Sequence, residues 1–315
     1  MKDVDPSVNV ARVLVFRVRF LEQAELPVWK GNIIRGAIGS VLPKVCGFKR
    51  LNCGKCLIWY MCPFGYLYRA RSKGIVLRKL RGVSKPFVLK PPLTDARSFS
   101  PGDMLEFSAV LAGDAVRFEK DLLVSVLELG GRGLGVKSAR GRFEVVEVAA
   151  RNPVTGFESI VYRGGSFFDS RAVVTVGDLV KRASEISSGK SLQASFLTPY
   201  RVVEGGVAGP LTSFESLVKS ALRRFSVIMP QYMYVNPVRD VGKLLEEARK
   251  VGLAGADLHR VPIVYRGKRE DYYVGTYEFK GEIGMDVALL LAFSELFHIG
   301  KRASYGHGWP VFLPG

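Results

Sequence analysis

The amino-acid sequence predicts an α+β protein of two tandem ferredoxin-like domains, each a mainly antiparallel sheet with helices on one face. Its 315 residues give two domains at about 100–200 residues each. One order of strand, helix, glycine-rich loop and strand occurs twice along the chain. Hydrophobic residues make up 48% and charged residues 24% of the chain, a balance that excludes disordered and fibrous proteins.

The first half of the chain contains this pattern once. Apolar residues alternate with Arg17 and Arg19 over 14–20, which predicts a half-buried strand. Helical spacing follows over 28–42, and Pro43 is expected to end that helix. The half is completed by a strand at 104–110, a helix ending at Leu129, a glycine loop and a strand at 142–146.

The second half repeats the pattern. A strand at 191–196 precedes a helix, and Thr212 and Glu215 have the spacing of a capping box at its start. A strand at 273–279, a helix ending at Phe297, a second glycine loop and a strand at 309–313 follow. The expected domains are therefore 1–150, with a four-cysteine insertion at 43–66, and 191–315, joined by a segment at 151–190 that adds a hairpin or short helix.

Charge predicts a polyanionic partner. The chain has 46 Lys and Arg against 29 Asp and Glu, a net charge of +17, which favours nucleic acid without excluding a merely basic surface. The strongly apolar run 287–293 is too short to span a bilayer, and the first residues lack a signal peptide's order, so we expect a soluble cytoplasmic protein and no membrane partner. Only five Asn and three Gln occur, which indicates a thermophilic source.

Both glycine loops combine glycines with cations. Glycine allows positive φ and close backbone approach, and free N–H groups beside Lys or Arg form an anion site. The alternative is that these glycines only end helices. Two loops at matching places favour contact with nucleic acid, and the residues expected to make it are Gly131, Arg132, Gly133, Gly135, Lys137, Gly300, Lys301, Arg302, Gly306, His307 and Gly308. Neither loop has the context of a nucleotide-binding fingerprint.

Several segments together resemble one known family. They are 35–39 (RGAIG), 62–64 (CPF), 85–89 (KPFVL), 101–103 (PGD), 196–201 (FLTPYR), 274–275 (VG) and 298–308 (HIGKRASYGHG). The chain is similar to the CRISPR-associated endoribonucleases that process precursor crRNA, the repeat-cleaving branch of the RAMP superfamily. The resemblance covers almost the whole chain, and the terminal glycine loop is its most specific part.

The resemblance implies two RAMP-type, RRM-like domains that bind CRISPR repeat RNA and cut it once per repeat. It also implies cleavage without a catalytic metal, by attack of the RNA's own 2′-hydroxyl, which leaves a 2′,3′-cyclic phosphate and a 5′-hydroxyl. The family pattern has a general acid/base histidine near the first helix, and no histidine occurs in the first half of this chain. The main alternative is therefore a RAMP protein without catalytic activity, which binds repeat RNA or is a structural subunit of a CRISPR effector complex.

The candidates for catalysis follow from position. His298 lies between a helix end and the second glycine loop, where the helix dipole favours a cationic imidazole beside a phosphate, although the same place suits an ordinary helix cap. Lys30, Arg35 and Tyr60 are further candidates, because the family places its catalytic groups in and after the first helix. His307 lies between two glycines, and its side chain could simply face solvent.

All four cysteines of the chain, Cys46, Cys53, Cys56 and Cys62, lie within one short stretch. Four clustered thiolates suit a structural Zn²⁺ or an iron–sulfur cluster. Two disulfides, as found in hyperthermophiles, or plain buried thiols are the alternatives. Four protein ligands would close the metal site, so we expect it to stabilise the insertion and not to catalyse. A redox protein built on the cysteines is a third functional hypothesis.

Overall fold

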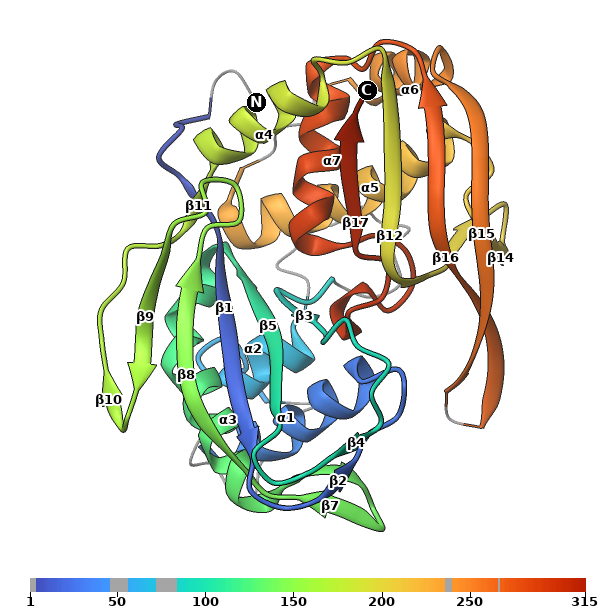
Figure 1. Cartoon of the computed structure of the whole chain (residues 1–315). Helices are drawn as coiled ribbons and strands as arrows, with labels where there is room; N and C mark the ends of the chain where they lie inside the picture. Colours follow the sequence, from blue (N-terminus) through green and yellow to red (C-terminus); the bar gives the residue numbers. More distant parts are fainter. Residues whose placement is uncertain (1–3, 46–55, 72–83, 236–239, 266) are drawn as a thin grey trace. The chain divides into compact units, whose positions relative to one another are not determined.

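The computed structural model describes residues 4–45, 56–71, 84–235, 240–265 and 267–315, and the chain divides into two compact units (Figure 1). Residues Asn9–Val174 form the N-terminal unit. Met1–Val8 and Thr175–Gly315 form the C-terminal unit. The segment expected to join two domains is thus divided between the units and contributes strands to the first and a helix to the second.

The N-terminal unit has a β-α-β-β-α-β order and the strand sequence β10-β9-β8-β1-β5-β3 across its main sheet. The pairs β8–β1, β1–β5 and β5–β3 are antiparallel, which is the ferredoxin-like arrangement. Helices pack against one face of this sheet (Figure 1). The main elements are β1 (Asn9–Phe20), α1 (Gly31–Val45), α2 (Pro63–Arg69), β3 (Phe87–Lys90), β5 (Met104–Ala112), α3 (Glu119–Arg132), β8 (Phe143–Arg151), β9 (Glu158–Arg163) and β10 (Ser166–Phe167).

The two faces of this sheet differ because side chains alternate along each strand. Phe16 on β1 and Phe107 on β5 are buried and stacked, with ring centres 5.1 Å apart. The next residue of β1, Arg17, points to the other face. The pattern predicted at 14–20 is therefore present as expected.

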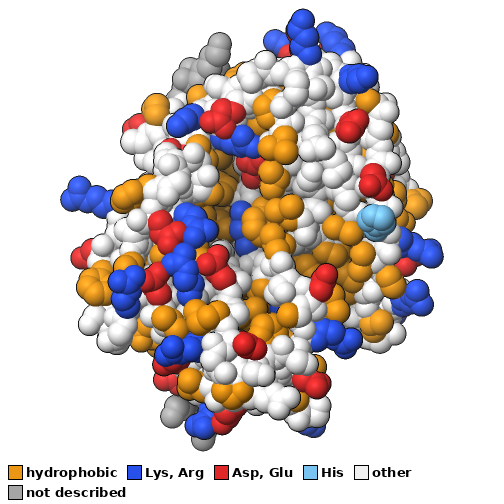
Figure 2. Space-filling view, in the orientation of Figure 1, with side chains coloured by type: hydrophobic (Ala, Val, Ile, Leu, Met, Phe, Trp, Pro, Cys, Tyr) orange, Lys and Arg blue, Asp and Glu red, His pale blue; other side chains and the backbone are white. Residues whose placement is uncertain are grey.

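Charged side chains cover part of the other face. Arg17 donates to Glu106 at 3.0 Å and to Glu158 at 2.9 Å, and it also contacts Glu147, which pairs with Arg163. We call this group the outer ion network. In Figure 2, Lys and Arg side chains alternate with acidic ones over this sheet. The network neutralises this face.

The C-terminal unit repeats the same order of elements, with the strand sequence β15-β16-β12-β17 and antiparallel neighbours throughout. The prediction of two ferredoxin-like domains is confirmed. The elements of this unit are α4 (Val176–Ile186), β12 (Ser191–Tyr200), β13 (Val202–Glu204), β14 (Val207–Gly209), α5 (Phe214–Ile228), a π-helical turn (Met229–Met233), α6 (Val241–Arg249), β15 (Gly252–Tyr265), β16 (Lys268–Lys280), α7 (Met285–Phe297), a 3₁₀ turn (Ala303–Tyr305) and β17 (Pro310–Pro314).

Strands β15 and β16 pair over their whole lengths, from Gly252 opposite Lys280 to Tyr265 opposite Lys268. Strand β12 pairs only with the part of β16 from Tyr273 to Lys280. The remaining part of the hairpin is a two-stranded ribbon beyond the sheet (Figure 1), which we call the β15–β16 ribbon.

Two local predictions are wrong. Pro43 lies inside α1, which continues to Val45. Only the proline's own N–H is missing, and this close to the helix end its loss is tolerated. The helix expected after 212 is capped by Ser213, whose side chain accepts from the Ser216 N–H, while the Thr212 hydroxyl donates to Glu204. Among the described residues no helix is long and apolar enough to cross a bilayer.

Candidate nucleic-acid interface

The C-terminal glycine loop, residues 298–308, joins α7 to β17 and is attached to the end of β12. The Lys301 N–H donates to the Arg201 carbonyl at 2.8 Å, and the Gly308 N–H donates to the Pro199 carbonyl at 3.1 Å. The Thr198 hydroxyl donates to the Gly306 carbonyl at 2.7 Å. These bonds fix the path of the loop backbone.

Two glycines in this loop are required by geometry. Gly300 and Gly308 have φ values of +79° and +67°. A Cβ atom would lie 2.5 Å from the Arg201 carbonyl oxygen at Gly300, and 2.1 Å from the Ile299 carbonyl oxygen at Gly308. Only glycine fits at both places, so part of the glycine pattern serves to hold the loop against β12.

Arg302 connects this loop to the β15–β16 ribbon. Its guanidinium contacts the Glu270 carboxylate and the Tyr272 hydroxyl and lies over the Tyr265 ring. Arg201 approaches the same carboxylate at 3.6 Å. The hydrogen bond from Arg302 holds the pKa of Glu270 below its usual value. Two guanidinium groups thus share one carboxylate, which leaves excess positive charge to attract a phosphate.

Lys301, by contrast, is exposed. An exposed ammonium group beside the loop is well placed to contact a phosphodiester as a point charge.

The two histidines of this loop are fully buried. His307 Nδ1 lies 3.0 Å from the Pro199 carbonyl oxygen, and burial lowers the pKa of His307 to about 4. His298 ends α7 with φ +61° and stacks on Trp309 at 5.7 Å between ring centres. The alternative that the His307 side chain faces solvent is wrong, since the ring packs against Tyr272. Both histidine side chains therefore pack in the interior and help to fix the conformation of the loop.

The first glycine loop differs from the expectation. Gly131 and Arg132 belong to the last turn of α3, and the residues beyond form a small hairpin of β6 (Leu134–Val136) and β7 (Ala139–Gly141). Glycine has a low helix propensity, but the buried apolar stripe of α3 extends through Leu129. Packing of this stripe stabilises the last turn despite its glycines.

This hairpin presents cations, while its glycines are packed. Lys137 and Arg140 of the hairpin are exposed, as is Arg132 at the end of α3. At Gly135 a Cβ atom would lie 2.3 Å from the Ala139 carbonyl oxygen, and at Gly141 it would lie 2.6 Å from that of Glu22. The glycines therefore allow tight packing, and only the cations are available for phosphates.

The remaining catalytic candidates lie in the N-terminal unit. Lys30 is buried just before α1, where its Nζ donates to the carbonyls of Thr94 at 2.8 Å and Val28 at 3.2 Å, and burial lowers its pKa. Arg35 is 3% exposed. Tyr60 is 47% exposed. Of the four candidates, Tyr60 alone has a largely exposed side chain.

Comparison with known families accounts for most of the chain. Residues 8–174, just over half of it, match the family model AF_1859_N, described as an N-terminal domain. Residues 194–309 match the model of the CRISPR-associated endoribonuclease Cas6. The chain belongs to the family of this N-terminal-domain model, and its residues 194–309 are Cas6-like. The match covers the whole C-terminal glycine loop.

This Cas6-like chain is 26% identical over 306 residues to an uncharacterized protein of Archaeoglobus fulgidus, an alignment that covers 92% of this chain and 93% of that protein. Among solved structures it is similar to Thermus thermophilus Cas6, with 13% identity, TM-score 0.54 and coverage of 98% of this chain and 100% of that chain. A Cas6 product complex has 15% identity and a TM-score of 0.57, and the match covers 96% of this chain and 100% of that chain. A partial Cas6-RT-Cas1–Cas2 complex has 12% identity and a TM-score of 0.58, and the match covers 98% of this chain and 46% of that chain. These structures establish the fold.

The cysteines of the Cas6-like chain are described in part. Cys46 and Cys53 lie outside the described residues. Cys56 and Cys62 are half-buried, and the Cys62 sulfur accepts from the Gly65 N–H at 3.4 Å, which caps α2. No group of three metal-ligating side chains occurs in the described part of the chain. The metal centre stays a prediction.

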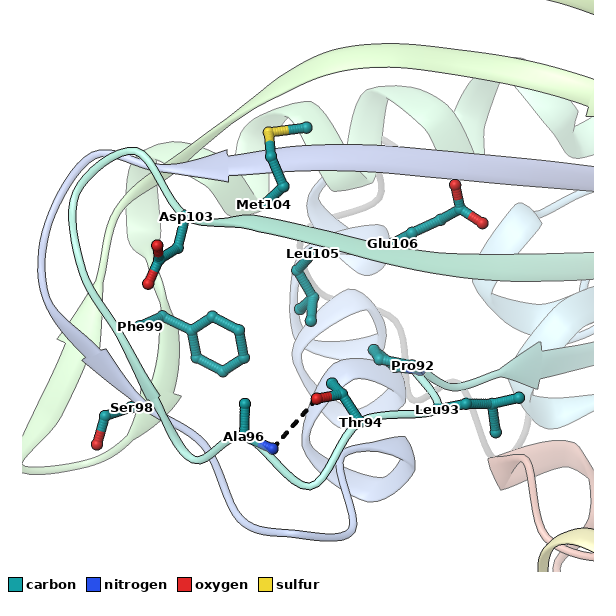
Figure 3. Close-up of a pocket in the computed structure, with 10 residues that line it drawn as sticks. All are labelled: Pro92, Leu93, Thr94, Ala96, Ser98, Phe99, Asp103, Met104, Leu105 and Glu106. Atoms are coloured by element: carbon teal, nitrogen blue, oxygen red, sulfur yellow. Dashed lines mark hydrogen bonds between the residues drawn. The ribbon is translucent and has the colours of Figure 1, made fainter.

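A hollow of about 430 Å³ in the N-terminal unit lies between residues 92–99 and the start of β5 (Figure 3). Its titratable lining residues are Asp103 and Glu106, and no Lys or Arg lines it. Carboxylates repel phosphates, so the hollow is not part of the interface.

Three residues of the candidate site were not predicted from the sequence. Glu270, Tyr265 and Tyr272 surround Arg302, but all belong to the ribbon and are at least 30 positions from it in sequence. Acidic and aromatic residues on a strand do not by themselves indicate a functional site in the sequence. Only the register of the two ribbon strands places these three residues beside the loop.

Proposed function

We propose that the chain binds CRISPR repeat RNA and cleaves precursor crRNA. One observation carries the proposal: the C-terminal glycine loop, with two arginines sharing one carboxylate, lies within the segment that matches the Cas6 endoribonuclease. A similar solved structure is described as a Cas6 product complex, and the matching family model is that of an endoribonuclease, which together support RNA as the ligand proposed here. The net charge of +17 fits the same ligand.

RNA phosphates would contact cations of both units. These are the exposed Lys301 and the half-buried Arg302 on the C-terminal glycine loop, and the exposed Arg132 and Lys137 at the end of α3 and on its hairpin. Backbone phosphates give affinity and register, while base contacts give sequence preference. We expect binding to weaken steeply with salt, because each neutralised phosphate of a single strand contributes about 0.7 to the slope of log K against log salt.

In the proposed cleavage, the 2′-hydroxyl oxygen bonds to the adjacent phosphorus as the bond to the 5′-oxygen breaks. The 2′-hydroxyl proton goes to solvent or a base, and the departing 5′-oxygen takes up a proton. The protein would orient the in-line attack and stabilise the negative charge with cations. Tyr60 is our candidate proton donor, because its phenol carries a proton to donate and its side chain is exposed.

The test is incubation with repeat RNA in EDTA, followed by mapping of the ends. We expect a 2′,3′-cyclic phosphate and a 5′-hydroxyl. RNA with a 2′-deoxy nucleotide just before the cut must bind equally well and stay intact. Cleavage of the deoxy RNA at the same position would overturn the mechanism, and absence of RNA binding would overturn the function.

A second candidate is repeat-RNA binding without cleavage, within an assembly of CRISPR proteins. The observation that favours it is the full burial of His298 and His307, because buried imidazoles do not reach a substrate. A relative of this fold is described in a Cas6-RT-Cas1–Cas2 complex, which supports other CRISPR proteins as partners. Tight binding of uncleaved repeat RNA in the same assay would select this function.

A further inference from the structure

One stretch of the chain holds almost all of its excess charge. Residues 26–94 contain 14 Lys and Arg and no Asp or Glu. The other 32 Lys and Arg share the rest of the chain with all 29 Asp and Glu. The glycine loops lie outside this stretch, so they do not explain its charge. Three described cations of this stretch, Arg35, Arg69 and Lys85, lie near one another.

Cations and aromatic rings alternate where α1, α2 and β3 meet. The Arg35 guanidinium lies 4.3 Å from the centre of the Tyr68 ring and 5.3 Å from that of Phe87. Tyr68 stacks on Phe64 with ring centres 5.6 Å apart. Arg69 lies over Phe64 at 5.9 Å. Aromatic faces attract cations, so this stack holds two guanidinium groups in fixed places.

Lys85 is the third cation of this group. Its Nζ donates to the Ala70 carbonyl, just after α2, at 3.0 Å. Burial is the main cause that lowers the pKa of Lys85, and the charges of Arg35 and Arg69 lower it further. No ion pair among the described residues includes Arg69 or Lys85. Like charges are held together here, a cost that a bound anion would relieve.

We propose that Arg69 and Lys85 form an RNA phosphate-binding site of the N-terminal unit, separate from both glycine loops. The inference rests on the proposed function, since it takes RNA as the ligand. Arg69 is exposed and Lys85 half-buried, so both can contact a phosphodiester from solvent. Arg35 is buried and is a positioning residue, because it holds Tyr68 through the ring and through the Tyr68 hydroxyl, which donates to the Arg35 carbonyl at 2.8 Å.

The test measures binding of fluorescent repeat RNA, with a 2′-deoxy nucleotide before the cut, to the full chain at several salt concentrations. For Arg69→Ala with Lys85→Ala we expect at least a tenfold loss of affinity near 0.1 M salt. The slope of log K against log salt should fall by about 1.4, the value for two phosphates of a single strand. Lys85→Met with Arg69→Gln keeps the side-chain stems and must give the same loss, which guards against misfolding of the alanine variant.

The matched control removes two charges elsewhere. Arg19 and Arg249 are exposed and paired with Glu144 and Glu215. Arg19→Ala with Arg249→Ala should keep the parental slope and change affinity less than twofold. An equal loss in both double variants, or no loss in either, would overturn the site while leaving RNA binding intact. If the parent binds no repeat RNA, the proposed function fails and the site fails with it.

Discussion

The Arg302 guanidinium lies 3.8 Å from the centre of the Tyr265 ring and contacts the Glu270 carboxylate on the facing strand of the same ribbon. Arg302 itself has left-handed backbone geometry, with φ +56°, in the turn after Gly300. One side chain thus joins the C-terminal glycine loop to the β15–β16 ribbon. A substitution in the loop should therefore affect the ribbon, and a substitution in the ribbon should affect the loop.

Replacing Glu270 tests this link through pH. Arg302 lowers the pKa of Glu270 in the folded state, so the pair stabilises the fold above the unfolded pKa of about 4.3, and this stability is lost as pH falls through the lower folded pKa. Glu270→Gln should therefore reduce the free energy of unfolding at pH 7 far more than at pH 3. Urea unfolding at both values measures it, with exposed Glu246→Gln as control. Equal losses at both pH values would contradict the link.

His307 should make the protein sensitive to mild acid. Burial lowers its pKa from 6.5 to about 4, so between these values the unfolded state binds more protons and stability falls as pH falls. The shift corresponds to about 3 kcal/mol between pH 7 and pH 4. His307→Gln should flatten this part of the stability profile in urea unfolding. His259, exposed on β15, is the control, and a His259→Gln variant that flattens the profile equally would refute the assignment.

Two glycine substitutions should have opposite effects on stability. Gly308→Ala forces positive φ on alanine and a clash with the Ile299 carbonyl, so we expect a loss above about 2 kcal/mol. Gly131 lies in α3 with open space around it, so Gly131→Ala should stabilise by about 0.5–1 kcal/mol. Thermal unfolding of the two variants decides. A neutral Gly308→Ala would show that the loop path is not fixed by this contact.

Single-turnover cleavage identifies the proton donor. Tyr60→Phe should slow cleavage by about 10²–10⁴-fold while RNA affinity is unchanged. His298→Ala should lower stability through the lost stacking on Trp309 and leave the rate for bound RNA near parental. The opposite pattern would return the role to His298, as the sequence predicts. Lys30→Met, which keeps the buried stem, serves as the comparison in the same unit.

The four cysteines should hold one zinc ion or one iron–sulfur cluster per chain. Elemental analysis of gently purified protein measures this, and Cys56→Ser should abolish it. We expect loss of the metal to lower stability and to leave cleavage by the folded protein unchanged, because four protein ligands close a site. Stoichiometric disulfides without metal would refute the prediction.

The sequence predicts the fold well because the buried faces of strands and helices require apolar residues at regular spacings along the chain. Phe16 and Arg17 alternate on β1 as the sheet requires, and the repeat of the whole pattern indicates the second domain. The sequence predicts the ends of helices poorly where glycines occur. At Gly131 the helix continues, and the glycines beyond it form a hairpin, because tertiary packing overrides local preference.

Of the candidate site, only the cations could be predicted from the sequence, and their partners could not. Arg302 is visible in a glycine loop, but its partner Glu270 is 32 positions away and is brought there by strand register. Likewise the stacking of Arg35 on Tyr68 depends on how α1 meets α2, which no periodicity encodes. Burial of His307 could not be foreseen either, since flanking glycines suggest exposure.

The outer ion network gives the N-terminal unit an electrical polarity. Its sheet face is neutralised by carboxylates from β5, β8 and β9, while α1, α2 and β3 belong to a stretch of sequence, residues 26–94, that contains no Asp or Glu. A polyanion diffusing nearby would experience a torque that turns this side of the unit toward it before any contact forms. Such preorientation raises association rates and vanishes as the Debye length shrinks with added salt. The acids of the network would therefore help to set the direction from which a polyanion approaches the unit.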